Sequence, residues 1–401
     1  MIESFLYGAW MGGKNSDNVT RKASMTPETQ PGLEGVIAAS TRLSCVDGLA
    51  GRLTIAGYAV EELAPKATFE EVAHLLWSGK LPNTHELHEL KEDLRSRRRL
   101  PSATLALLRE AAKRATPAMD ALRMAVSSLS LGREESTNDD ARTLVAAFPA
   151  IVGGYYRLKN GQQPVEPREN LSHSEHCLHQ IFGSEIGPER ARGIETYLNT
   201  VCDHGLNAST FAARVIVSTR SDLVSAITGA VGALKGPLHG GAPGPALEMI
   251  FEIGKAGRAE TLIRAKLQRG ERLMGFGHRV YRVRDPRADV LALAAERFYS
   301  TEGNRDFYDL ARAVEKTALR LLAEHKPDRR LDTNVEFYTA LLLHGLGLPN
   351  ELFTPIFAVG RVLGWTAHCL EQLREGCIRI IGDELGSPRR EARRRSKSSL
   401  A

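Results

Sequence analysis

Apolar side chains recur along this chain mainly at the spacing of an α-helix. Within residues 86–94, Leu87, Leu90 and Leu94 fall on one helical face, and a basic run follows at residues 95–99. The same periodicity predicts helices over residues 104–114, 223–234, 258–267, 288–299, 307–324, 335–344 and 353–372. Helical patterning therefore dominates the chain.

Signals for β-strands are few. Residues 51–57, with a turn expected at residues 46–48, predict one small hairpin. Strands and helices do not alternate, and Gly275 and Gly277 lack the third glycine of a dinucleotide-binding turn. The pattern predicts an all-α fold.

The helix over residues 223–234 is unusually rich in small side chains. Asp222 is a good N-cap for it, and Ala226, Gly229, Ala230 and Gly232 allow close backbone approach. We expect this helix deep in a helix–helix interface, within one subunit or between two.

Composition limits the class of protein. The chain has 401 residues, 42% of them hydrophobic, which suffices for two domains with a substantial core. No uncharged apolar run approaches the ~20 residues of a membrane span. The five cysteines are scattered without a CxxC pair, so neither a zinc ribbon nor a disulfide framework is indicated. We expect a cytoplasmic protein.

Both ends differ from the body. Residues 388–401 hold six basic residues and one acidic residue, which together equal the whole net charge of +5. We expect residues 387–401 to be a disordered basic tail, and without interleaved aromatic residues it predicts no binding to nucleic acid or membrane. Residues 1–30 are expected to be a disordered extension, because the start lacks the basic segment of a signal peptide and Met25 resembles a natural beginning.

Candidate chemistry is concentrated in glycine-rich turns. His204 lies in Asp-His-Gly-Leu-Asn-Ala-Ser-Thr, His239 in Gly-Pro-Leu-His-Gly-Gly-Ala-Pro, and His278 in Gly-Phe-Gly-His-Arg. Thr-Asn-Val-Glu-Phe-Tyr adds the carboxylate of Glu336. Arginines accompany the set at Arg282, Arg287, Arg361 and Arg379. Hydrogen-bonding histidines, one carboxylate base and several guanidinium groups suit carbon–carbon bond chemistry on a polyanionic substrate.

Each feature also has a structural interpretation. A single histidine in a helical protein is usually structural, but the glycines around His239 and His278 permit positive φ and close approach of backbone N–H groups to a ligand. The arginines between residues 279 and 287 form either a solvated face or an anion clamp. Asp285-Pro286-Arg287, directly after a glycine–histidine loop, favours the clamp.

A second group of histidines is a candidate for a metal site. His173, His176 and His179, beside Cys177, are spaced at i, i+3 and i+6. On a helix that spacing spreads over roughly 120°, which is poor for a shared ion. We favour a polar helix face and predict no metal site.

The motifs, in this order, resemble the citrate synthase family over residues 32 to about 386. They are Asp-His-Gly-Leu-Asn-Ala-Ser-Thr-Phe, Leu-Lys-Gly-Pro-Leu-His-Gly-Gly-Ala, Met-Gly-Phe-Gly-His-Arg-Val-Tyr and Asp-Pro-Arg. The resemblance implies an all-α homodimer in which a smaller, mobile helical domain closes over the substrates. The large domain would comprise residues 31–236 and 346–386, and the small domain, with the coenzyme A and catalytic loops, residues 237–345.

The resemblance also implies residue roles. Oxaloacetate would be bound by His204, Arg287 and Arg361, with Arg379 reaching the neighbouring subunit's site. His239 would hydrogen-bond the thioester carbonyl oxygen, His278 the ketone, and Glu336 would be the general base. Coenzyme A would be received by Leu273, Met274, Gly275, Phe276, Gly277 and Arg282. Beyond the coenzyme A thioester substrate, no cofactor or metal is implied.

The implied reaction condenses acetyl-CoA with oxaloacetate and water to citrate and coenzyme A. A carboxylate can deprotonate a thioester methyl group only where a preorganised site stabilises the enolate. One alternative is a 2-methylcitrate synthase using propionyl-CoA, since one methylene changes binding by only ~1–3 kcal/mol. Another is a non-catalytic paralogue that binds dicarboxylates.

Three departures from the family pattern motivate the second alternative. Glu336 stands where the base is usually aspartate. Ala56 precedes Gly57-Tyr58 where a basic residue often contacts coenzyme A. Ile380 and Ile381 follow Arg379 where a proline is usual.

Overall fold

The computed structural model describes residues 39–131, 137–240 and 243–375. The chain divides into a unit of Met1–Ser40, of which only the last two residues are described, and a unit that begins at Thr41. The predicted disordered ends and Arg379 lie outside the described residues.

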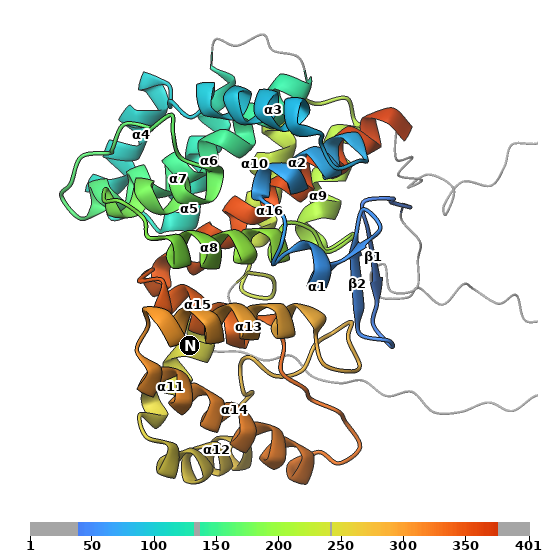
Figure 1. Cartoon of the computed structure of the whole chain (residues 1–401), viewed down its shortest axis with the longest axis vertical. Helices are drawn as coiled ribbons and strands as arrows, with labels where there is room; N and C mark the ends of the chain where they lie inside the picture. The colour runs from blue at the N-terminus through green and yellow to red at the C-terminus, as the bar shows by residue number, and fades with distance from the viewer. Residues whose placement is uncertain (1–38, 132–136, 241–242, 376–401) are drawn as a thin grey trace, which may run out of the picture. The chain divides into compact units, whose positions relative to one another are not determined.

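The described part is mostly helical, as predicted (Figure 1). The helices are α1 (Val60–Leu63), α2 (Phe69–Ser78), α3 (Thr84–Ser96), α4 (Ser102–Lys113), α5 (Ala118–Ser127), α6 (Thr137–Lys159), α7 (His173–Phe182), α8 (Pro188–Val201), α9 (Ala208–Ser218), α10 (Leu223–Leu234), α11 (Pro243–Ile253), α12 (Ala259–Gln268), α13 (Pro286–Thr301), α14 (Arg305–His325), α15 (Val335–Gly345) and α16 (Phe353–Glu375). Short 3₁₀ turns occupy Ser128–Ser130, Ala256–Arg258 and Asn350–Leu352. Every helix predicted from periodicity is present. No helix in the described ranges is both long and apolar enough to cross a membrane.

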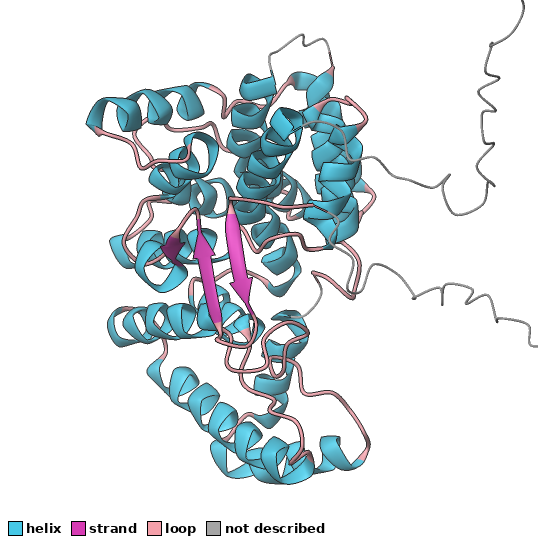
Figure 2. Ribbon diagram, turned by 90° about the vertical axis from the view of Figure 1, so that its right-hand side faces the viewer, coloured by secondary structure: helices cyan, strands magenta, loops and turns pink. Residues whose placement is uncertain are grey.

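The predicted hairpin is part of an antiparallel sheet of β1 (Ser44–Asp47), β2 (Arg52–Ile55) and β3 (Tyr58–Ala59) (Figure 2). The turn predicted at residues 46–48 was placed too early, because Val46 and Asp47 end β1. The Asp47 carboxylate accepts hydrogen bonds from the Leu49 and Ala50 N–H groups at 3.0 and 2.9 Å, which builds the turn after it.

Helix α16 runs through the helical core and is buried along most of its length. It packs against α6, α8, α9 and α10 (Figure 1). Two glycines bring it close to the end of α8: a Cβ on Gly360 would lie 3.0 Å from the Leu198 carbonyl oxygen, and one on Gly364 2.2 Å from that of Cys202. Side chains of α16 therefore reach the loop that follows α8.

The close packing predicted for α10 is present against α9. A Cβ on Gly229 would lie 2.2 Å from the Cδ1 atom of Ile216, so a larger side chain there would require Ile216 of α9 to move. Asp222 caps α10, accepting from the Ser225 N–H at 2.7 Å as expected.

Helices α11 to α15 pack among themselves, and α13 also packs against α8 (Figure 1). The starts of α9, α13 and α15 are held by Asn207, Asp285 and Asn334, whose side chains accept backbone N–H hydrogen bonds. Arg287 and Glu336 lie in the first turns that follow two of these caps, those of α13 and α15.

The histidines of α7 lie on a helix but do not form a solvated face. His173, His176 and His179 are at most 3% exposed. His173 stacks on Phe69 with 4.2 Å between ring centroids. Within the described residues no cluster of three histidine, cysteine or carboxylate side chains is placed to hold a metal ion.

Candidate active site

His204, His278 and Tyr281 form a cluster of three mutually contacting rings. His204 follows the end of α8, and its Nε2 atom lies 3.1 Å from the Tyr281 hydroxyl. The rings of His204 and His278 have centroids 5.8 Å apart. Burial, then the charges of Arg287 and Arg361, lower the pKa of His204 well below its usual value. Burial, supported by the two cations, therefore favours the neutral imidazole of His204.

The tautomer of His278 follows from its backbone contacts. Its Nδ1 atom accepts hydrogen bonds from the Val280 and Tyr281 N–H groups at 3.0 and 3.1 Å. Burial, and then Arg287, lower its pKa to about 4. The neutral ring must carry its proton on Nε2. That nitrogen lies 3.4 Å from Nη2 of Arg287, which is also a donor, so in this tautomer neither group satisfies the other and both can donate to an acceptor on a ligand.

Arg287 is fixed by its own N-cap. Asp285 caps α13, and its carboxylate accepts from Nε and Nη2 of Arg287 at 3.1 and 2.8 Å and from the Val335 N–H at 3.2 Å. Asp285 and Arg287 are both buried. The guanidinium is therefore oriented before any ligand arrives.

Arg361 enters the same neighbourhood from α16. It is 2% exposed, and its Nε atom donates to the Val201 carbonyl oxygen at 2.6 Å. Burial lowers the pKa of Arg361 to about 10, and the negative charge of Asp203 partly offsets this decrease. Among the described residues no hydrogen-bond acceptor contacts its terminal nitrogens, which leaves them for an anionic ligand.

Glu336 lies in the first turn of α15. Its backbone N–H is capped by Asn334 at 3.0 Å, and the side chain is half-buried. Burial raises the pKa of Glu336 to about 7, while Arg287 and Arg361 act in the opposite direction. A carboxylate with this pKa can accept a proton near neutral pH.

His239 is oriented by Ser209. Its Nε2 atom lies 2.7 Å from the Ser209 hydroxyl oxygen and 3.4 Å from the Ser209 backbone N–H. Trp365 donates to the same hydroxyl oxygen at 3.1 Å. Because a backbone N–H can only donate, we assign Nε2 as the acceptor and the proton to Nδ1; the Ser209 hydroxyl then donates to Nε2 rather than to Oδ1 of Asn207, which lies at the same distance of 2.7 Å. Burial, then Arg361, lower the pKa of His239 to about 4.

The glycine loop before His278 is bound to the segment before Glu336. Asn334 donates through its N–H to the Gly275 carbonyl oxygen at 2.9 Å and through Nδ2 to that of Gly277 at 2.7 Å. Gly275 and Gly277 have φ of 90° and 77°, and a Cβ on Gly275 would lie 3.0 Å from Phe337. The loop and the carboxylate are therefore held as one piece.

The arginines between residues 279 and 287 diverge. Arg279 and Arg282 are exposed, and Arg284 is bound to Glu315 at 3.0 Å and Asp289 at 2.5 Å. Arg287 alone of this group contacts His278. The predicted clamp thus comes from Arg287 together with the distant Arg361.

Sequence reasoning assigned no role of their own to the supporting residues of the site, namely Ser209, Tyr281, Asp285 and Asn334, although Asp285 belongs to the motif that marked Arg287. Asp285 and Asn334 each precede a helical pattern and were recognisable as N-caps. The contact of Ser209 with His239 joins residues 30 positions apart and gives no local signal.

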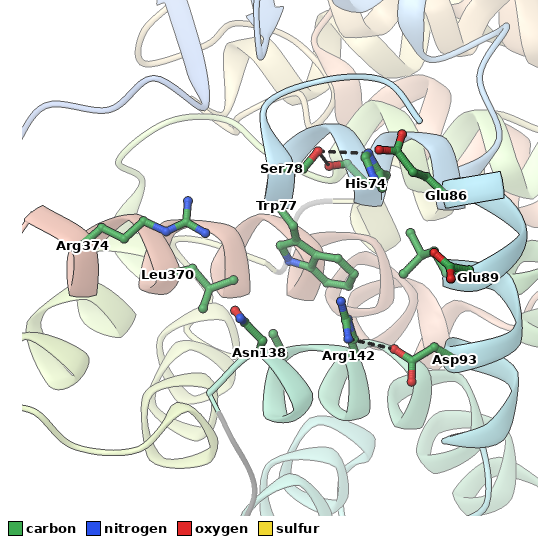
Figure 3. A pocket seen from close by; sticks show the side chains of 12 residues that line it. His74, Trp77, Ser78, Glu86, Glu89, Asp93, Asn138, Arg142, Leu370 and Arg374 are labelled. Carbon is green, nitrogen blue, oxygen red and sulfur yellow. Dashed lines mark hydrogen bonds and ion pairs between the residues drawn. The ribbon is translucent and has the colours of Figure 1, made fainter. Parts of the chain in front are cut away.

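A separate pocket of about 440 Å³ lies among α2, α3, α6 and α16 (Figure 3). Trp77 and Leu370 line it, and Arg142 at its edge pairs with Asp93 at 3.2 Å. No predicted site residue lines it.

The comparisons decide the family. The family model described as "Citrate synthase, C-terminal domain" matches residues 32–381. The chain belongs to the citrate synthase family. Citrate synthase 2 of Bacillus subtilis is 40% identical over 348 residues, 85% of this chain and 91% of the relative. The 2-methylcitrate synthase of Mycobacterium tuberculosis H37Rv is 38% identical over 353 residues, 86% of this chain and 87% of the relative.

Solved structures agree with the predicted all-α citrate synthase fold. The citrate synthase of Pyrobaculum aerophilum superposes with a TM-score of 0.80 at 37% identity, covering 90% of this chain and 95% of that one. A citrate synthase of Thermoplasma acidophilum, solved as a ternary complex with carboxymethyl coenzyme A and oxaloacetate, gives a TM-score of 0.79 at 31% identity, covering 90% and 96%. The chain is an acyltransferase of the citrate synthase type.

Proposed function

We propose that this protein condenses acetyl-CoA with oxaloacetate and water to citrate and coenzyme A. One observation carries the proposal. Glu336, a carboxylate with a pKa of about 7, lies within electrostatic reach of Arg287 and Arg361, and two neutral histidines, His204 and His278, lie beside these arginines. The cations suit a dicarboxylate, and the carboxylate suits proton abstraction.

Glu336 removes a proton from the thioester methyl group, and Nδ1–H of His239 donates to the carbonyl oxygen that becomes the enolate. Nε2–H of His278 polarises the ketone, the enolate carbon attacks the ketone carbon, and the alkoxide that forms is protonated along the hydrogen bond from His278. Arg287 and Arg361, with His204, hold the carboxylates. Water then hydrolyses the citryl thioester. The arginines and histidines supply the positive potential, so the mechanism uses no metal or further cofactor.

Coenzyme A is proposed to bind at residues 273–277 and Arg282. The exposed side chain of Arg282 supports this, because a phosphate can reach it from solvent. The Arg282 N–H donates to the Gly48 carbonyl oxygen at 2.8 Å, which places the β1–β2 turn beside the same loop. Ala56, in the neighbouring β2–β3 turn, offers no phosphate contact.

Three further expectations belong to this proposal. The homodimer, with Arg379 completing the neighbouring subunit's site, follows from the family. The small domain over residues 237–345 and its closure follow from the same source. The scattered cysteines favour a cytoplasmic location.

The test is free-thiol release from acetyl-CoA and propionyl-CoA, each with and without oxaloacetate. Release that depends on oxaloacetate is expected with acetyl-CoA. The ratio of the two kcat/KM values separates citrate synthase from 2-methylcitrate synthase, an alternative kept open by the 38% identical mycobacterial relative. No release from either thioester by the folded protein would favour the non-catalytic binder.

The pH dependence of kcat/KM should follow the ionisation of Glu336. Since the base must be ionised and its pKa is about 7, kcat/KM should rise about tenfold per pH unit below 7 and level off above it. His239 and His278, with pKa values of about 4, stay neutral throughout and cannot cause the rise. Steady-state kinetics from pH 5.5 to 8.5 check this, with circular dichroism at each pH as the control. A flat profile contradicts the assignment of the base.

Ser209→Ala should lower kcat by about 10- to 100-fold, because loss of one strong hydrogen bond frees the His239 ring. The KM for oxaloacetate should stay within about threefold, since Ser209 contacts His239 rather than the arginines. Steady-state kinetics with each substrate varied provide the measurement. Thr210→Ser, in the same turn, is the matched control. A variant that loses affinity for oxaloacetate with unchanged kcat would reverse the assignment.

A further inference from the structure

A chain of buried polar side chains lies behind the candidate active site. Asp203, His368 and Arg214 are each 0% exposed. Asp203 immediately precedes His204, His368 is on α16, and Arg214 is on α9. None of the three has a role in the proposed mechanism.

The hydrogen bonds among these three side chains show which atom donates in each contact. Nη1 of Arg214 lies 3.2 Å from Nδ1 of His368, and a guanidinium group has only donors, so Nδ1 is an acceptor. The imidazole proton is therefore on Nε2, which lies 3.1 Å from the Asp203 carboxylate. His368 donates to Asp203.

Arg214 is itself immobilised. Its guanidinium donates to Gln372 at 2.8 Å, Glu371 at 2.7 Å and Glu375 at 3.2 Å. Glu371 also accepts from the Arg42 N–H at 2.9 Å. A buried, oriented donor thus fixes the acceptor nitrogen of His368.

The carboxylate of Asp203 interacts electrostatically with Arg361 of the site. The side chain packs against Gly364, where an added Cβ would lie 3.0 Å from its Oδ1 atom. Burial alone would raise the pKa of Asp203, but His368, Ser44 and Arg361 together lower it. Asp203 is therefore an ionised counter-charge for Arg361 that leaves the terminal nitrogens of Arg361 available to substrate.

We propose that His368 is a positioning residue for the dicarboxylate: by holding Asp203 it fixes the loop of His204 and keeps the counter-charge of Arg361 in place. The inference deepens the proposed function, on which the identity of the ligand as oxaloacetate rests. If the network served only to stabilise the fold, its disruption would lower the melting temperature without a specific loss of oxaloacetate affinity.

Two substitutions separate the two contacts of His368. In His368→Gln the amide nitrogen takes the place of Nε2 and can still donate to Asp203, while the contact with Arg214 is lost. In His368→Asn the amide oxygen takes the place of Nδ1 and can still accept from Arg214, but the shorter side chain does not reach Asp203. His176→Asn, at another fully buried histidine, is the matched control.

Isothermal titration calorimetry with oxaloacetate, without any thioester, is the experiment, and circular dichroism melts accompany it. His368→Gln and His176→Asn should bind oxaloacetate within about threefold of the wild type, whereas His368→Asn should bind about 10- to 100-fold more weakly. Binding by His368→Asn within threefold of the wild type, or equal weakening in both His368 variants, would overturn the inference. Because no turnover is measured, absence of thiol release by the wild type would refute the proposed reaction alone.

Discussion

Glu336→Gln is expected to lower kcat by about 10³-fold or more and yet to make the protein more stable at pH 8. General-base catalysis contributes about 10²- to 10⁴-fold, and a neutral amide cannot accept the methyl proton. The glutamine amide has nearly the shape of the carboxylic acid. The hydrogen bond from the backbone N–H of residue 336 to Asn334, and that from Asn334 to Gly275, therefore remain. The loss should therefore fall on kcat, with oxaloacetate binding preserved.

The gain in stability follows from the sign of the pKa shift. Glu336 has a pKa of about 7 in the folded protein, above its ordinary 4.5, so folding favours the protonated acid. That contribution is complete below pH 4.5 and is lost as the pH rises through 7. At pH 8 the half-buried carboxylate is ionised, and replacing it with glutamine should stabilise the fold by about 1–3 kcal/mol. At pH 5 the two proteins should be nearly equal in stability.

Thiol-release kinetics and chemical denaturation at pH 5 and pH 8 check both parts. Glu336→Asp is the matched control, because it keeps a carboxylate and retracts it by about 1.5 Å. It should retain measurable turnover and an acid limb in its pH profile. Full activity in Glu336→Gln would refute the assigned base. Zero activity in the wild type, restored in Glu336→Asp, would identify the natural protein as a non-catalytic binder.

Periodicity predicted the helices well because their apolar faces are local in sequence. The helix over residues 223–234 begins at its predicted cap, and its small residues pack against α9 as expected. The β1–β2 turn was misplaced because Val46 and Asp47 read locally as a turn, whereas their pairing with Leu53 and Arg52 decides the strand. The burial of His173 was likewise hidden, since its ring stacks on Phe69 of α2, more than 100 positions away.

The site was recognised through motifs, and its supporting contacts were not. Glycine turns marked His239 and His278, and the Asp-Pro-Arg motif marked Arg287. The contacts behind the site that come from distant segments left no such mark: Trp365 reaches Ser209 across 156 positions, and His368 reaches Asp203 across 165. Such contacts arise only when α16 packs beside α8 and α9, so residue spacing cannot reveal them.

His278→Ala should lower kcat by about 10²- to 10³-fold and leave the helix content intact. The Nε2–H group of His278 is the proposed donor to the oxaloacetate ketone, and a preorganised donor of this kind is worth about 10²- to 10³-fold in kcat. The side chain is half-buried in a loop, so no helix depends on it. Its loss does leave the Val280 and Tyr281 N–H groups without their acceptor, at a local cost of about 1–2 kcal/mol.

His278→Asn separates that local cost from the chemistry. The asparagine oxygen can take the place of Nδ1 and accept from both N–H groups, while nothing replaces Nε2. If His278 acts through Nε2, the asparagine variant should recover the melting temperature of the wild type and remain as inactive as the alanine variant. Recovery of turnover together with stability would show that His278 only shapes the loop, and the polarisation of the ketone would then fall to Arg287.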